Sequence, residues 1–262
     1  MIRITELTKR FGPLHVLRGL DLEIAAGRVT AILGPNGAGK TTLMKTILGL
    51  TRSDGGKILV DGERVSDDPA YRSHIGYMPQ IARFPENLSG AELIAMLRDL
   101  RGADAAIDDD LIARFRLDDQ LRKPLRVLSG GTRQKGNAVL AFLFQPDLLV
   151  LDEPTAGLDP VSSGILKDKI GEVRDAGRTV IVTSHVLSEL DALADDIVFL
   201  VDGQLRYTGS IRDLKRATRQ LSLERAIAHV MSRVNTLVRL LLTTTTATFI
   251  FRTNLRARCG CR

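Results

Sequence analysis

Tryptophan is absent from this 262-residue chain, and aromatic residues make up only 4% of it. The core must therefore be mainly aliphatic, as is common where helices cover a largely parallel sheet. Cysteine is nearly absent too. Cys259 and Cys261 lie among the last residues, so no disulfide framework is possible within the chain. With no His or further Cys close to them, they predict an incidental tail rather than a soft-metal site.

Long apolar runs are also missing. A membrane-spanning helix needs about 18 consecutive apolar residues, and the longest candidate, Ala138–Leu151, is interrupted by Gln145, Pro146 and Asp147. The N-terminus opens with an alternating strand pattern and shows no signal peptide. We therefore expect a soluble, cytoplasmic chain.

The net charge of +6 is concentrated in the tail. From Ser210 onward, 11 Lys and Arg residues stand against 2 Asp and Glu, whereas the rest of the chain carries 26 and 29. A basic surface is typical of proteins that bind nucleic acid or anionic membranes. Because the body is mildly acidic, we expect no nucleic-acid partner for it.

Strand patterns alternate with helical ones along most of the chain. This order predicts an α/β fold with a mostly parallel sheet. A helical stretch at about residues 87–141 interrupts it and predicts an inserted smaller lobe. Helices are expected after residue 40 through Leu50, around Ser163–Ala176 and near Val186–Leu193. The expected strands are Ile2–Leu7, Leu20–Ile24, Arg28–Leu33, Lys57–Val60, Ile75–Met78, Leu148–Leu151, Thr179–Thr183 and Ile197–Val201.

The sequence after residue 218 differs from the body. Residues 219–242 include an apolar stripe that predicts an amphipathic helix, Gln220–Val234. Residues 243–262 combine TTTTATFIF with an Arg-rich end and carry no helix start signal. We expect them to be disordered or an artefact of the reading frame.

A glycine-rich segment, GPNGAGKTT, follows the strand expected at Arg28–Leu33. Glycines let backbone N–H groups turn inward around phosphate oxygens, and the helix that begins there presents its positive end to the same anion. Lys40 would neutralise phosphate charge and Thr41 would hold Mg²⁺. The alternative is a plain glycine-rich turn. The candidate nucleotide-binding residues are Gly34, Pro35, Asn36, Gly37, Ala38, Gly39, Lys40, Thr41 and Thr42.

A second segment, LLVLDEPT, places two carboxylates at the end of a buried strand. Asp152 would orient Mg²⁺. Glu153 is one residue further, so its side chain is expected to point the other way and to polarise an attacking water. The alternative is a pair of ordinary strand-end acids before the turn at Pro154.

The segment LSGGTRQ begins at Leu128. Ser129 can cap a helix, and Gly130 and Gly131 expose backbone N–H groups at its start. One γ-phosphate cannot be served by two distant pockets of one monomer. We therefore predict a dimer in which each subunit offers this turn to the other's nucleotide; the alternative is a plain helix cap.

Four further residues are candidates for the same site. Asp159 would lie at the dimer seam, unless it only forms a turn with Pro160. His185 follows a strand and could donate to the γ-phosphate, or be structural. Gln80 could contact Mg²⁺ or the attacking water, or be merely solvated. Phe11 could stack on adenine or belong to the core.

These segments together resemble the nucleotide-binding subunit of ATP-binding cassette (ABC) transporters. GPNGAGKT resembles the Walker A motif, LLVLDE the Walker B motif and LSGGTRQ the family signature. Gln80, Asp159 and His185 are similar to the Q-, D- and H-loop residues, and Phe11 to the A-loop aromatic. The resemblance covers about residues 1–218.

The resemblance implies an ATP-binding α/β core, an antiparallel β portion and a helical subdomain. It also implies Mg²⁺-dependent ATP hydrolysis in a head-to-tail dimer that drives a separate membrane permease. The permease is expected to dock near residues 80–97, which would place the chain peripherally on the inner face of the cell membrane.

YMPQIARFPENLS and LSGGTRQK further resemble the ATPases that accompany copper-site maturation of nitrous-oxide reductase. Lys135 stands where many family members have Arg. Three alternatives remain open: a soluble ABC-type ATPase acting on ribosomes or nucleic acid, an exporter ATPase for drugs or lipids, and a non-hydrolysing regulatory cassette. Lys40, Glu153 and His185 argue against the last.

Overall fold

The computed structural model describes residues 1–65, 70–102 and 105–232, which fall into two compact units divided after Ile211. The described part of the second unit is helical. It contains nearly all of α7 (Ile211–Thr218) and a helix at residues 223–232. The remainder of the predicted 219–242 helix and the 243–262 tail lie outside the described residues.

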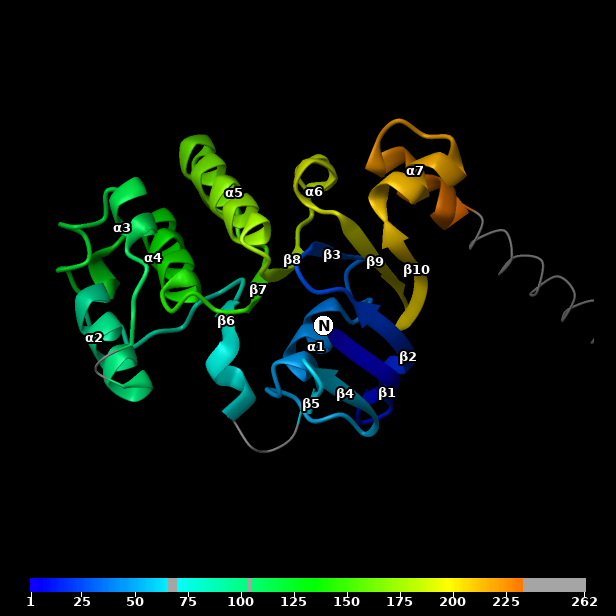
Figure 1. Cartoon of the computed structure of the whole chain (residues 1–262), viewed down its shortest axis with the longest axis horizontal. Helices are drawn as coiled ribbons and strands as arrows, with labels where there is room; N and C mark the ends of the chain where they lie inside the picture. Colours follow the sequence, from blue (N-terminus) through cyan, green and yellow to red (C-terminus); the bar gives the residue numbers. More distant parts are fainter. Residues whose placement is uncertain (66–69, 103–104, 233–262) are drawn as a thin grey trace, which may run out of the picture. The chain divides into compact units, whose positions relative to one another are not determined.

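A six-stranded sheet forms the centre of the first unit, in the order β10-β9-β3-β8-β7-β6 among the described residues (Figure 1). All its neighbouring pairs are parallel except β10 with β9. Every residue of β3, β7 and β8 is buried, which explains their continuous apolar sequences. The α/β prediction is confirmed. The strands are β3 (Val29–Leu33), β6 (Ile75–Met78), β7 (Leu148–Asp152), β8 (Thr179–Thr183), β9 (Asp196–Val201) and β10 (Gln204–Ser210).

A smaller antiparallel sheet, in the order β2-β1-β4-β5, packs with helix α1 (Lys40–Ile47) against one face of the central sheet. Its strands alternate buried and exposed positions, as one-sided sheets do. The main core lies between the two sheets and includes Leu43 and Ile47 of α1. The strands are β1 (Ile2–Phe11), β2 (Leu14–Ile24), β4 (Gly55–Val60) and β5 (Glu63–Arg64).

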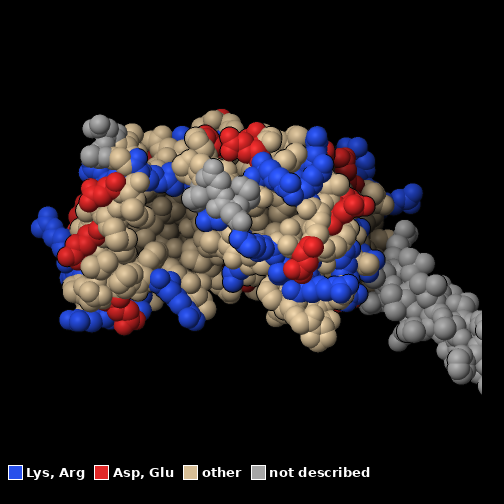
Figure 2. All heavy atoms as spheres, turned by 90° about the horizontal axis from the view of Figure 1, so that it is seen from below, with Lys and Arg blue, Asp and Glu red and all other residues tan. Residues whose placement is uncertain are grey.

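The inserted helical part lies between β6 and β7 in sequence and gathers beside β6 in space (Figure 1). Ser89 and Glu92 form a capping box at the start of α2. Leu93 is buried, whereas Leu100, seven residues further along the same helix, is 75% exposed. Seen from below, this side of the molecule is hollowed, with Lys and Arg side chains around the hollow (Figure 2). The helices are α2 (Gly90–Arg101), α3 (Asp110–Arg114) and α4 (Gly130–Phe142), followed later by α5 (Pro160–Asp175) and α6 (Leu187–Leu193).

Candidate functional site

The glycine loop connects β3 to α1, and its backbone requires glycine at two positions. Gly34 has φ of 151°, and a Cβ there would lie 2.1 Å from the carbonyl oxygen of Leu200. Gly39 precedes α1 with φ of 100°, and a Cβ would lie 2.9 Å from the carbonyl oxygen of Val16. Both positions combine a left-handed backbone with a close neighbour, so the loop conformation is specified by these residues.

Lys40 is the first residue of α1, and its side chain folds back over the loop. Its Nζ donates to the carbonyl oxygens of Gly34 at 2.8 Å and Pro35 at 3.1 Å. Burial lowers the pKa of this ammonium, while the nearby carboxylates of Glu153 and Asp152 oppose the shift. A cation, a helix start and two carboxylates therefore meet at the carboxyl ends of β3 and β7.

Asp152 ends β7 and is almost fully buried, with 5% of its surface exposed. Its Oδ1 accepts a hydrogen bond of 2.7 Å from the hydroxyl of Thr183, at the end of the neighbouring β8. This leaves Oδ2 without a hydrogen bond to any described residue. A buried carboxylate with one free oxygen and a lysine nearby fits a site for a hard cation.

Glu153 follows directly and adopts φ of 51°, a conformation that residues other than glycine rarely take and that clusters at functional sites. Its Oε1 lies 2.6 Å from Nε2 of His185, and its Oε2 accepts a 3.0 Å hydrogen bond from Nε2 of Gln80. The structure thus brings together three residues that the sequence predicted from separate segments.

The LSGGTRQ turn is placed elsewhere. Ser129 caps α4, since its Oγ accepts from the backbone N–H of Thr132 at 3.2 Å. Gly130 and Gly131 form the first turn of the helix. Among the residues that the structure describes, no hydrogen bond or ion pair joins this turn to the glycine loop.

Asp159 caps α5. It accepts from the backbone N–H of Ser162 at 2.9 Å and from its hydroxyl at 2.6 Å, and it lies 3.1 Å from Nζ of Lys135. These hydrogen bonds from Ser162 and the Lys135 ammonium hold the pKa of Asp159 well below its usual range. Asp159 therefore links α5 to the helix that carries the LSGGTRQ turn.

Phe11 ends β1 with 51% of its surface exposed, so it does not belong to the core. The ammonium of Lys9 lies 5.1 Å from the centroid of its ring, within cation–π range. The exposed ring is available for stacking. Its role toward adenine stays a prediction.

Two hydrogen bonds next to the site residues were not anticipated from the sequence. Thr183 fixes Asp152, and Asn137 of α4 donates to the carbonyl oxygen of Pro79 at 2.9 Å. The sequence contains a signal for each. Thr183 stands at the end of an apolar strand just before His185, and Asn137 is a polar residue ahead of an apolar helical run.

Comparison with known proteins identifies the family of the chain. The sequence profile of the family described as ABC transporter matches residues 17–156. The chain is 39% identical to the daunorubicin resistance ATP-binding protein DrrA3 of Streptomyces coeruleorubidus, over 83% of this chain and 70% of that protein. It is 32% identical to the lantibiotic transport ATP-binding protein SrtF of Streptococcus pyogenes, over 80% of this chain and 93% of that protein.

Solved structures show the same architecture. An ATP-binding subunit of an ABC transporter superposes with a TM-score of 0.83 at 28% identity, covering 88% of this chain and 99% of that one. A dimeric ATP-binding cassette bound to ADP and Pi gives 0.73 at 22% identity, covering 81% and 99%, and shows the shared fold. The chain therefore belongs to the ABC transporter family and is one of its ATP-binding subunits, an ATPase.

Proposed function

We propose that Glu153 is the base that accepts a proton from the water attacking ATP. The observation that carries this assignment is the carboxylate held between His185 at 2.6 Å and Gln80 at 3.0 Å. Each carboxylate oxygen has a further lone pair with which to accept from water. The two neighbours therefore fix the orientation of the base while each oxygen can still accept a hydrogen bond from water.

The phosphates of ATP are assigned to the glycine loop and Lys40. Among the described residues, the Lys40 ammonium donates to two neutral carbonyls, at 2.8 and 3.1 Å. Phosphate oxygens offer it stronger, charge-assisted hydrogen bonds. The N–H groups of the loop and of the first turn of α1 face the same anion. Adenine is assigned to the exposed ring of Phe11.

Mg²⁺ is assigned to oxygen ligands alone. No group of three or more His, Cys, Asp or Glu in the described part of the chain forms a ready metal site. The ion must therefore draw on the free oxygen of Asp152, the hydroxyl of Thr41, the amide oxygen of Gln80 and the nucleotide itself. When bound, it would neutralise charge on the phosphate oxygens.

The turn at Ser129–Gly131 is assigned to the nucleotide of a second subunit. It begins α4, so its free N–H groups and the helix dipole favour an anion. Because nothing in the described residues joins it to the glycine loop of the same chain, a head-to-tail partner is the simplest way to use it. Asp159, tied to α4 through Lys135, would lie at that seam.

Replacing Ser129 tests the shared site. Ser129→Tyr should lower ATP hydrolysis at least about hundredfold, because a bulky side chain at the turn blocks the second subunit's phosphate and removes transition-state stabilisation. ATP binding to the monomer should stay unchanged. Ser129→Ala, which loses the cap and costs about 1 kcal/mol of stability, is the matched control. Full activity of the Tyr variant would refute the shared site.

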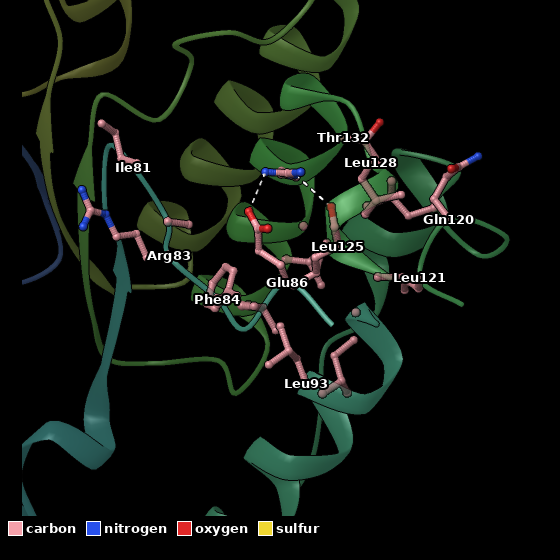
Figure 3. Close-up of a pocket in the computed structure, with 18 residues that line it drawn as sticks. Ile81, Arg83, Phe84, Glu86, Leu93, Gln120, Leu121, Leu125, Leu128 and Thr132 are labelled. Carbon is pink, nitrogen blue, oxygen red and sulfur yellow. Dashed lines mark hydrogen bonds and ion pairs between the residues drawn. The ribbon is translucent and has the colours of Figure 1, made fainter. Parts of the chain in front are cut away.

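We assign the docking site of the membrane permease to a cavity of about 440 Å³. The cavity lies between α2, the start of α4 and the segment that follows β6 (Figure 3). Its wall is largely apolar, with Leu93, Leu121 and Leu125 among the lining residues. At its edge Arg133 lies 3.8 Å from Glu86 and donates to the carbonyl oxygen of Leu125. This wall suits apolar side chains of a short cytoplasmic helix.

We propose that the permease is a separate chain, because the relatives are named as ATP-binding proteins of transport systems. No helix among the described residues has the length and apolar content needed to cross a bilayer. We place the subunit peripherally on the inner face of the membrane, held there by the permease.

A charge at the cavity edge should weaken permease binding. Ile81 lines the cavity and is 72% exposed, so Ile81→Glu should cost little stability. Affinity for the membrane permease should fall at least about tenfold, because a charge would have to be desolvated. Co-purification measures this. Leu221→Glu, at a 93% exposed position, is the control and should leave permease binding unchanged. If the Ile81 variant bound the permease as tightly as the unmodified chain, the cavity would be excluded as the docking site.

Two substrate classes are proposed. The names of the relatives, daunorubicin resistance and lantibiotic transport, favour an exporter of drug-like or amphipathic molecules. The segments YMPQIARFPENLS and LSGGTRQK favour copper maturation of nitrous-oxide reductase as the second candidate. A deletion strain assayed for drug tolerance and for reductase copper content separates them.

A further inference from the structure

A buried polar side chain in α4 has no place in the site as assigned so far. Asn137 is 1% exposed and is followed by the buried apolar residues Ala138 and Val139. Its Nδ2 donates to the carbonyl oxygen of Pro79 at 2.9 Å. The carbonyl can only accept, so the amide orientation is fixed by chemistry. A buried amide is costly unless it is hydrogen-bonded, so this contact is specific.

The accepting carbonyl belongs to the peptide unit that leads into Gln80. Pro79 follows the end of β6, and its carbonyl and the N–H of Gln80 are parts of one planar group. Holding that oxygen fixes the orientation of the peptide and limits where the side chain of Gln80 can reach. Gln80 in turn donates to Oε2 of Glu153 at 3.0 Å.

The same helix also contacts the residue that follows Glu153 in the chain. Nε2 of Gln134 donates to the carbonyl oxygen of Pro154 at 3.3 Å, and its Oε1 lies 3.5 Å from Nδ2 of Asn137. Both residues lie within the first turns of α4, which begins at the LSGGTRQ turn. An α-helix moves as a rigid element, so a displacement of its start reaches both contacts.

We propose that Asn137 is a positioning residue for ATP hydrolysis, which ties the helix beginning at Ser129 to Gln80 and through it to the carboxylate of Glu153. This inference rests on the role of Glu153 proposed above. It gives α4 a specific function. A nucleotide bound at the start of α4 then affects the position of Glu153 through the buried hydrogen bond from Asn137 to Pro79.

The test measures hydrolysis, ATP binding and thermal unfolding of the full-length chain with Asn137 replaced. Asn137→Ala should lower kcat about tenfold, roughly the rate equivalent of one buried hydrogen bond. KM for ATP should change less than about twofold, because the glycine loop is untouched. Asn137→Leu fills the space without a donor and should show the same loss. The number of ATP molecules bound per chain should stay the same, which excludes a misfolded fraction.

A double-mutant cycle separates positioning from stability. If Asn137 acts through Gln80, then Asn137→Ala should change kcat less than about twofold once Gln80→Ala is present. A merely structural residue would cost the same in both backgrounds, and that result would overturn the proposal. Tyr71→Phe, which removes a buried hydroxyl bonded to the carbonyl of Ile47, is the control and should leave kcat unchanged.

Failure of the inference is distinguishable from failure of the proposed function. If Glu153→Gln abolishes hydrolysis while Asn137→Ala leaves kcat intact, only the positioning role is wrong. If Glu153→Gln hydrolyses ATP normally, the assignment of the base itself is wrong and the inference fails with it.

Discussion

Glu153→Gln should lower the steady-state rate of ATP hydrolysis by about 10²–10⁴-fold, the range expected for loss of a general base. The amide is nearly isosteric with the carboxylate, so the space between His185 and Gln80 stays filled and the glycine loop is not disturbed. ATP binding should therefore persist. Bound but unhydrolysed ATP should trap the dimer, which size-exclusion chromatography with light scattering would detect.

The chain offers a matched control for this variant. Asp147 precedes β7 and lies 3.1 Å from Nδ1 of His74, so it is a carboxylate–histidine pair at the opposite end of the same strand. Asp147→Asn should hydrolyse ATP at the unmodified rate. If the Glu153 variant kept its activity and stayed monomeric with ATP, Glu153 would not be the base.

Lys40→Ala should raise the dissociation constant for ATP about hundredfold. The ammonium is the cation nearest the proposed phosphate position, and charge-assisted hydrogen bonds contribute roughly 1.5–3 kcal/mol each. Its nearness to the carboxylates of Glu153 and Asp152 means that removing it also leaves two negative charges facing the phosphates. Equilibrium binding of a fluorescent ATP analogue measures the change.

Lys45 supplies the control, because it lies on the same helix and is exposed. Lys45→Ala alters the net charge by the same amount but does not touch the glycine loop. Unchanged binding by the Lys45 variant with a large loss at Lys40 would assign the effect to the loop. Equal, small losses of ATP affinity in the two variants would show only a general electrostatic contribution of positive charge.

The buried strands were predictable because their sequences are short apolar runs. Ile75–Met78 and Thr179–Thr183 have the bounds expected from sequence. Strands of the small sheet were underestimated. β1 extends to Phe11 and β2 starts at Leu14. The end of β1 carries the polar residues Thr8, Lys9 and Arg10, which interrupt the apolar alternation. β10 was missed for the same reason.

The residue types of the site could be predicted, but their contacts could not. The sequence indicated Gln80, Glu153 and His185 separately, since each follows a strand. That Gln80 and His185 hold opposite oxygens of one carboxylate depends on β6, β7 and β8 being neighbours in the sheet. The bond from Asn137 to Pro79 joins segments 58 residues apart and has no local pattern.

The two consecutive carboxylates illustrate how one strand end serves two purposes. Asp152 is still in the strand and is buried, whereas Glu153 turns into a left-handed conformation at φ of 51°. The two side chains differ in environment because the backbone turns at Glu153, more than because side chains alternate along a strand. Thr183 contacts both, through the side chain of Asp152 and the backbone N–H of Glu153.

The most direct measurement is a high-resolution structure of the Glu153→Gln chain with Mg²⁺ and ATP. The account predicts two chains with each triphosphate gripped by Lys40 and the glycine loop of one copy and by the N–H groups of Gly130 and Gly131 of the other. A map in which ATP fills the glycine loop while every Ser129–Gly131 turn stands remote from nucleotide would contradict it.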